Sequence, residues 1–313
     1  MKVLLAGASG AIGVPIASQL MAHGHQVLGL TRDPIGAHRI EALGATAVIA
    51  DALQRDGLLR AVDGLYADAV VHELTALRKP PARHSGMALT NRLRTEGTTN
   101  LLAAADAVGA RRYVTQSIIF GYGYRDHGSR ILTEEAPFGE PAGNRCDPHL
   151  AAMLSTEQQA FTAPEGIALR YGLLYGGDGR QMHAQLARRR VPVAPGGLLG
   201  WIHHEDAAAA TVAAVESGSA GRVYNVVDDE PASWDEVITG MAAAFGAPRP
   251  WVLPRWLFRL AAPYVASFVV DTLMRVSNAR AKAELDCRPT YPSWREGVRA
   301  MASGSAVRTE RAG

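Results

Sequence analysis

The feature that most constrains this chain is a set of three evenly spaced glycines near its start. Glycines occupy positions 7, 10 and 13, between the apolar run Lys2–Ala6 and the segment Val14–His23, which has helical spacing and ends at Gly24. Glycine permits a tight turn, close approach of a pyrophosphate to amides at a helix N-terminus, and close packing of that helix on the strand. The pattern therefore predicts a dinucleotide site at the following residues: Gly7, Ser9, Gly10, Ala11 and Ile12.

Apolar runs bounded by turn residues alternate with helical patterns over most of the chain. Helices are predicted at 53–62 and 91–108. The predicted strands are Lys2–Ala6, Gln26–Leu30, Ala45–Ala50, Ala69–His72, Arg112–Gln116, Ile167–Tyr171 and Val223–Val227. This alternation is typical of βαβ units and predicts an α/β Rossmann fold with a doubly wound parallel sheet.

The sequence changes character after residue 175. Residues 1–175, completed by 200–228, are predicted to form the dinucleotide-binding domain. Segments 176–199 and 229–303 contain more Pro, Trp and Gly and are predicted to form a smaller, substrate-binding lobe over the carboxyl ends of the strands. Residues 304–313 are interpreted as a flexible tail.

Charge and cysteine content narrow the choice of partners. The 32 Lys and Arg residues nearly balance the 30 Asp and Glu residues, so the sequence predicts a small-molecule ligand, with no nucleic-acid or membrane partner. Two cysteines, Cys146 and Cys287, make no disulfide framework and show no metal-ligand spacing, which indicates a reducing cytoplasm and no metal site. The oligomeric state is left open.

The end of the second predicted strand bears on the choice of cofactor. Leu30-Thr31-Arg32 places an arginine where an acidic residue would bind the ribose hydroxyls of NAD. A guanidinium instead suits the 2′-phosphate of NADP. Since Asp33 follows, a solvent-facing loop arginine is the alternative. The sequence favours NADP(H).

Further motifs extend beyond the glycine turn. They include Gly97-Thr98-Thr99-Asn100-Leu101-Leu102, Leu169-Arg170-Tyr171-Gly172 and Trp201-Ile202-His203-His204-Glu205-Asp206. Together they resemble the extended short-chain dehydrogenase/reductases, a family that also contains sugar-nucleotide epimerases and dehydratases, over nearly the whole chain. The resemblance implies that Asp206 caps the following helix and that the cofactor contacts several strand ends. These contacts are Asp51, Ala52, His72, Glu73, Leu74, Gln116, Tyr171, Gly172 and Leu173.

The acid–base pair usual in that family is missing. Its members carry a serine after the fifth strand and a Tyr-x-x-x-Lys pair on the next helix, where lysine lowers the pKa of the proton-transferring tyrosine. Ser117 is retained here, but with Glu157 setting the register, His149 holds the tyrosine position and Met153 the lysine position. Ser117 and His149 are therefore the candidate catalytic residues. A surface or capping role is the alternative for His149.

The missing pair does not exclude reduction, because hydride transfer needs only a nicotinamide held against an electrophilic carbon. The proton could come from His149, a loop tyrosine, water or a hydroxyl of the substrate. The sequence predicts an NADPH-dependent ketoreductase for a bulky, polycyclic aromatic ketone, similar to family members that tailor polyketide antibiotics. Its predicted substrate contacts are Tyr122, Tyr124, Met153 and Tyr175. A non-catalytic NADP(H)-binding redox sensor and a sugar-nucleotide epimerase or dehydratase are the alternatives.

Overall fold

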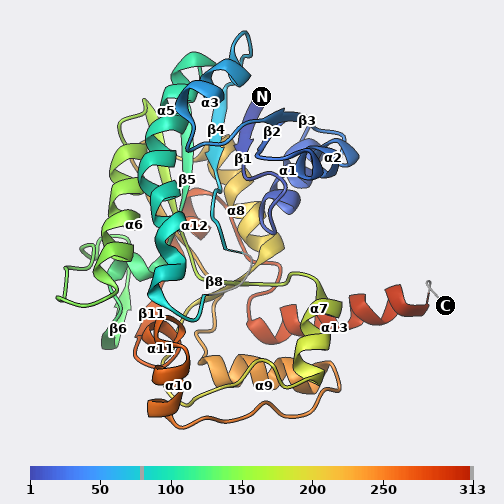
Figure 1. Ribbon diagram of the computed structural model, residues 1–313, viewed down its shortest axis with the longest axis vertical. Coiled ribbons are helices and arrows are strands. Elements are labelled where there is room, and N and C mark those ends of the chain that lie inside the picture. Colours follow the sequence, from blue (N-terminus) through green and yellow to red (C-terminus); the bar gives the residue numbers. More distant parts are fainter. Residues whose placement is uncertain (78–80, 311–313) are drawn as a thin grey trace.

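A sheet of parallel strands forms the centre of the molecule in the computed structural model, which describes residues 1–77 and 81–310 (Figure 1). Seven strands are hydrogen-bonded in the order β10-β7-β5-β4-β1-β2-β3. They are β1 (Lys2–Ala6), β2 (Gln26–Thr31), β3 (Thr46–Ile49), β4 (Ala69–His72), β5 (Arg112–Ile118), β7 (Glu165–Tyr171) and β10 (Val223–Val226). Every neighbouring pair is parallel, so all carboxyl ends share one edge. The order reverses between β1 and β4, which confirms the predicted doubly wound Rossmann sheet.

Helices cover both faces of this sheet (Figure 1). One face packs against α1 (Gly13–Ala22), α2 (Pro34–Ala42) and α8 (His204–Ser217). The other face packs against α3 (Arg55–Val62), α5 (Thr98–Ala107) and α6 (Asp147–Ala160). Because the central strands are buried on both sides, they consist of continuous apolar runs rather than alternating patterns.

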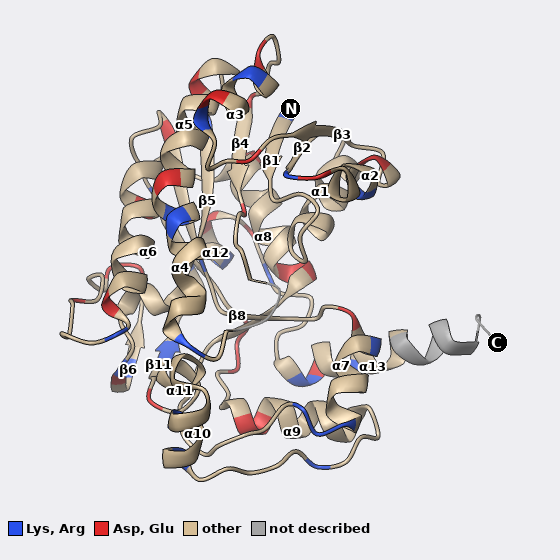
Figure 2. Ribbon diagram, in the orientation of Figure 1, with Lys and Arg blue, Asp and Glu red and all other residues tan. Residues whose placement is uncertain are grey.

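A smaller lobe lies beyond the carboxyl edge of the sheet (Figure 1). The pair β8 (Leu173–Tyr175) and β9 (Trp201–His203) leads into it from β7. Its helices are α7 (Gly179–Ala187), α9 (Trp234–Ala244), α10 (Arg255–Ala261), α11 (Pro263–Val269) and α13 (Trp294–Glu310). Figure 2 shows Lys and Arg interspersed with Asp and Glu along the ribbon. Within the described residues, no helix has the length and apolar character needed to cross a membrane.

Two helices differ from the sequence-based expectations. The helix predicted over 91–108 begins as α4 (Ala88–Arg92) and passes through a π-helical turn, η2 (Leu93–Gly97), before continuing as α5. Such turns insert an extra residue into the helix and often occur at functional sites. The segment from Gly304 is helical as far as Glu310, whereas residues 311–313 lie outside the described part.

The prediction that Asp206 caps α8 is wrong. The N-cap is His203, whose Nδ1 accepts a hydrogen bond from the Glu205 amide (3.2 Å). Asp206 instead accepts hydrogen bonds from the backbone amides of Thr290 (2.7 Å) and Tyr291 (3.0 Å). Its carboxylate therefore joins the Rossmann domain to the chain that leads into α13.

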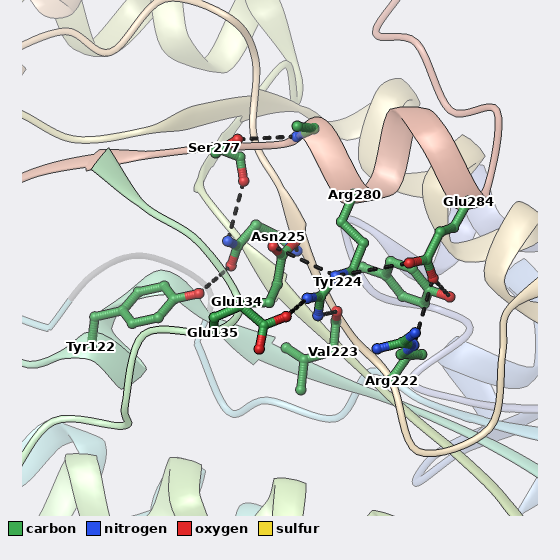
Figure 3. Close-up of polar contacts among 11 residues, drawn as sticks. Tyr122, Glu134, Glu135, Arg222, Val223, Tyr224, Asn225, Ser277, Arg280 and Glu284 are labelled. Atoms are coloured by element: carbon green, nitrogen blue, oxygen red, sulfur yellow. Dashed lines mark hydrogen bonds and ion pairs between the residues drawn. The ribbon is translucent and has the colours of Figure 1, made fainter. Parts of the chain in front are cut away.

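Polar contacts fasten the edge strand β10 to segments that the sequence analysis had not assigned (Figure 3). Tyr122, in the turn η3 (Ile119–Tyr122), donates a hydrogen bond to Asn225 Oδ1 (2.8 Å), and Asn225 Nδ2 donates to the Ser277 carbonyl (3.2 Å). Arg280 of α12 (Ala279–Glu284) pairs with Glu135. Nearby, β6 (Asp126–Leu132) and β11 (Leu273–Val276) form a second parallel pair. These contacts hold the C-terminal segments against the sheet.

Candidate active site

The turn between β1 and α1 is shaped to receive an anion. Gly7 has a φ of 93°, a conformation that favours glycine, and its carbonyl oxygen accepts the Gly10 amide (2.9 Å). A Cβ at Gly13 would overlap that same carbonyl oxygen. Helix α1 begins after Ile12 with no side-chain cap and no acidic residue in its first turn. Its N-terminal amides therefore suit the pyrophosphate of a dinucleotide.

The end of β2 lies beside this turn. Ser9 Oγ is 3.3 Å from Thr31 Oγ1, and only a glycine fits at Gly36, where a Cβ would overlap Thr31 Oγ1. Asp33 is the N-cap of α2 and accepts the Gly36 amide (2.7 Å). Arg32 is exposed. The Asp33 carboxylate thus caps α2, while the Arg32 guanidinium at the end of β2 is accessible to a ligand phosphate.

Asp51 and Ala52 lie after β3, in the region where the adenine is expected. Asp51 Oδ1 accepts the Leu53 amide (2.9 Å), and the Ala52 carbonyl accepts a hydrogen bond from Asn100 Nδ2 (2.8 Å). The side chain of Asp51 is half-buried. These bonds fix the backbone of the loop, and direct contact with the cofactor stays a prediction.

His72, the last residue of β4, directs its imidazole into the core. Its Nε2 is hydrogen-bonded to Thr98 Oγ1 (3.1 Å), which is bonded in turn to Thr156 (2.9 Å), and its Nδ1 accepts the Leu74 amide (3.2 Å). Burial lowers the pKa of His72 to about 4. The side chain is therefore neutral and joins β4 to α5 and α6.

Glu73 and Tyr171 form a buried polar chain beneath the glycine turn. The Tyr171 hydroxyl oxygen lies 2.9 Å from Glu73 Oε1 and 2.5 Å from Thr211 Oγ1, and the Thr211 hydroxyl donates to the Ala207 carbonyl (2.7 Å). Since each hydroxyl has one proton, all three bonds form together only if Glu73 is protonated and donates to Tyr171. Burial likewise raises the pKa of Glu73 to about 8. The backbone of Glu73 lies against Gly7, and its neutral carboxyl adds no negative charge that would repel a bound phosphate.

Ser117 is fully buried, and its hydroxyl is already engaged. Ser117 Oγ donates to Glu157 Oε1 (2.6 Å), and Glu157 accepts two hydrogen bonds from Arg170 (2.9 and 2.7 Å). Gln116, the neighbouring residue in β5, is partly exposed and lies on the opposite side of the strand. Ser117 thus joins a buried ion pair that links β5, α6 and β7, and its contact with a substrate carbonyl stays a prediction.

The chain leaves β7 through Gly172 and Leu173. The Leu173 amide donates to the Gly200 carbonyl (2.9 Å), and a Cβ at Gly172 would come within 2.8 Å of that oxygen. Tyr175, predicted to contact substrate, is buried in the lobe core with its ring 6.3 Å from that of Trp201. A packing role therefore accounts for Tyr175.

His149 and Met153 occupy the places of the missing tyrosine and lysine on α6. Both side chains are buried. The two ring nitrogens of His149 are hydrogen-bonded to His84 (3.1 Å) and Asn91 (2.9 Å), and its ring packs edge-on against Tyr264. Burial, followed by the proximity of His84, lowers the pKa of His149 to about 4. His149 is therefore neither at the surface nor a helix cap, and at neutral pH it carries no acidic proton.

Two loop tyrosines were predicted to face the substrate, and the structure separates them. Tyr122 is buried, with its hydroxyl directed at β10 (Figure 3). Tyr124 stacks on Phe120 (5.0 Å between ring centroids) and lines a cavity of about 180 Å³ that Cys146 and Leu150 also border. Of the pair, Tyr124 is the one placed to contact a ligand.

Three residues of this region were missed by the sequence analysis. His84, Arg94 and Tyr264 come from η1 (His84–Met87), η2 and α11, and all lie around His149. Arg94 is 5% exposed, although an arginine in a charged helical segment usually indicates a solvated face. The π-helical turn that carries it has no recognisable sequence pattern. No sequence pattern within any one of these segments could have predicted that the three residues lie together.

The sequence of this chain matches a known family over most of its length. The NAD dependent epimerase/dehydratase family matches residues 3–227. The chain belongs to that family, and this confirms the resemblance to extended short-chain dehydrogenase/reductases. It is an NAD(P)-dependent oxidoreductase of this class.

Two curated relatives are reductases by name. The chain is 40% identical over 314 residues to a 3-diazoavenalumate denitrifying reductase from Streptomyces sp., covering 95% of this chain and 99% of the relative. It is 27% identical to a 2-alkyl-3-oxoalkanoate reductase from Stenotrophomonas maltophilia (strain K279a), covering 80% and 77%.

Solved structures support the fold. A Bifidobacterium longum UDP-glucose 4-epimerase with NAD+ and UDP superposes with a TM-score of 0.78 at 18% identity, covering 99% of each chain. Human epimerase family protein SDR39U1 with NADPH gives a TM-score of 0.77 at 20% identity, covering 97% of this chain and 99% of that chain. At these identities the likeness extends to the fold alone.

Proposed function

We propose that this chain uses NADPH to reduce an aromatic carboxylate substrate by replacing a diazo group with hydrogen and releasing N2. The observation that carries the proposal is the state of α6, where the proton-transferring tyrosine and its lysine are replaced by His149 and Met153. His149 is neutral with both nitrogens engaged, and Met153 is a buried apolar side chain. Such a site is suited to a reduction that needs no proton from the protein.

The stoichiometry of the two reductions explains this preference. A bound nicotinamide supplies a hydride. An arenediazonium ion plus a hydride balances as an arene plus N2, so the product requires no further proton. Reduction of a ketone instead leaves an alkoxide, which a general acid must protonate. The lack of an acid at the α6 positions of the family's tyrosine and lysine therefore impairs reduction of a ketone and leaves reduction of a diazonium ion unaffected.

The Streptomyces relative supports the same conclusion. Its name describes loss of nitrogen from a diazo compound, and its identity of 40% extends over nearly both chains. Both named relatives act on carboxylates. Arg32 at the end of β2, with no acid in its place, supports NADPH as the hydride source.

The test mixes the purified protein with NADPH and 3-diazoavenalumate under anaerobic conditions. We expect one N2 released per NADPH consumed, and little turnover of polycyclic hydroxy-ketones. His149→Gln retains hydrogen-bonding groups and should keep the rate within about 3-fold, since loss of a general acid costs roughly 100-fold or more. NADPH consumption without N2, or a collapse of the rate in this variant, contradicts the proposal.

Ketone reduction is the second candidate function. Tyr124 favours it, because its ring lines the cavity and its hydroxyl could protonate an alkoxide. The 2-alkyl-3-oxoalkanoate reductase is a relative of that kind. Turnover of aromatic ketones that falls by about 100-fold or more in Tyr124→Phe would favour this candidate. Tight uptake of a uridine or thymidine diphosphate would instead favour an epimerase or dehydratase.

A further inference from the structure

Arg94 is a buried cation that forms no ion pair with any side chain that the structure describes. Its side chain is 5% exposed, and its Nε has no hydrogen-bond partner. By contrast, the other deeply buried arginine of residues 1–77 and 81–304, Arg170, is paired with Glu157 at 2.7 Å. Since an arginine side chain stays protonated in proteins, the fold keeps an uncompensated positive charge in its interior.

The surroundings of Arg94 belong to the candidate active site. It lies on the π-helical turn η2, which packs against α6. Its charge acts on His149, Tyr124 and Tyr264, and it lowers the pKa that each would otherwise have. Tyr124 in turn lines the cavity beside α6. The unpartnered cation therefore acts on Tyr124, the one of these three aromatic side chains that lines the cavity.

A cation in this position is costly unless an anion compensates it. Removing a guanidinium from water without a counter-charge destabilises the folded chain. Glu157 is the acid that acts on Arg94, but both of its oxygens are taken by Arg170 and Ser117. The part of the chain that the structure describes therefore supplies no counter-anion for Arg94, and a ligand can.

We propose that Arg94 binds the carboxylate of the substrate and selects anionic aromatic substrates over neutral ones. A guanidinium offers parallel donors that match the two oxygens of a carboxylate. The inference rests on the proposed function only in taking this region as the substrate site. It does not require that the reacting group be a diazo group.

The first test compares an acid with its ester. The NADPH-loaded protein is titrated by calorimetry with avenalumate and with its methyl ester, and with cinnamate and methyl cinnamate. We expect the wild-type chain to prefer the acids, and Arg94→Met to lose about 30-fold or more in affinity for them while ester binding changes little. Arg92→Met is the matched control, because Arg92 is exposed and pairs with Glu96 on the same helical segment. It should behave as the wild type.

A second measurement separates binding from folding. Arg94→Met removes an unpaired buried charge, so the apo variant should resist urea better than the wild type. Arg94→Lys keeps the charge but loses the paired donors, and its acid affinity should fall between the two. If neither acid binds the wild type, or if Arg94→Met retains the preference for acids, the inference is overturned. A loss of NADPH affinity with the acid preference intact would assign Arg94 to the cofactor and also overturn it.

The two proposals fail in different ways. Acid binding that depends on Arg94, without release of N2, would contradict the proposed reaction and leave this inference standing. Release of N2 together with acid binding that does not depend on Arg94 would support the proposed reaction and overturn this inference.

Discussion

Replacing Glu73 by glutamine should change how the stability of this protein depends on pH. The hydrogen-bond chain through Tyr171 and Thr211 is complete only with a protonated carboxyl, and burial raises the pKa of Glu73 from 4.5 to about 8. Because the folded-state pKa exceeds the unfolded value, this stabilisation is fully present below about pH 4.5 and is lost as the pH rises towards 8. A glutamine side chain in this place would copy the neutral acid at every pH, since its amide can donate to Tyr171.

The size of the effect follows from the shift. At about 1.36 kcal/mol per pKa unit, the wild type should lose roughly 3 kcal/mol relative to Glu73→Gln between about pH 5 and pH 7.5. Urea unfolding at the two pH values measures this difference. Other buried groups such as Asp228, whose pKa burial raises to about 8, are present in both chains and cancel.

Glu96→Gln provides the control. Glu96 is exposed, and the adjacent Arg92 lowers its pKa. Replacing Glu96 should therefore have a small effect of the opposite sign. The free energy of unfolding of the wild type should rise slightly relative to that of the variant as the pH rises. If the difference in free energy of unfolding between the wild type and Glu73→Gln is the same at both pH values, Glu73 is not a neutral carboxyl in the folded chain.

Three single variants and one double variant test the cofactor turn and the buried ion pair. Arg32→Ser should weaken NADPH binding about 10- to 100-fold in calorimetry and leave NADH unchanged, whereas equal losses would refute 2′-phosphate recognition. Gly13→Ala places a Cβ over the Gly7 carbonyl and 2.8 Å from the Cα of Ala8, so cofactor binding should be lost; retained binding in the same titration would contradict this geometry. Glu157→Gln should cost about 3–5 kcal/mol in urea unfolding, because it leaves a buried guanidinium unpaired. Adding Arg170→Met should restore most of that loss, and a double variant no better than the single one would argue against the pair.

The sequence predicted those parts of the molecule that depend on neighbouring residues. Strand β1, the turn at Gly7 and helix α1 are contiguous, and buried parallel strands carry apolar runs that can be recognised locally. The sequence analysis did not predict that Ser117 is buried, although the alternation of side chains along a strand directs the Ser117 side chain away from that of Gln116 and towards α6. The environment of His149 depends on η1, η2 and α11, which meet only in the folded chain. Contacts between side chains of such distant segments produce no regular spacing in the sequence, so the sequence could not predict them.

Arg94 also bears on the neutrality of His149, and this gives a final prediction. A protonated His149 would stand near an uncompensated guanidinium in a poorly solvated region, and Arg94 is one of the causes that lower its pKa. A bound carboxylate would neutralise that charge, so the pKa of His149 should rise from about 4 when an aromatic acid binds. Nitrogen-15 NMR of labelled histidines can follow the titration between about pH 3.5 and 6. His204, whose pKa of about 4 results from burial and His203, is an internal control that should not move. A His149 pKa that stays at its apo value with the acid bound would show that the anion does not lie near Arg94.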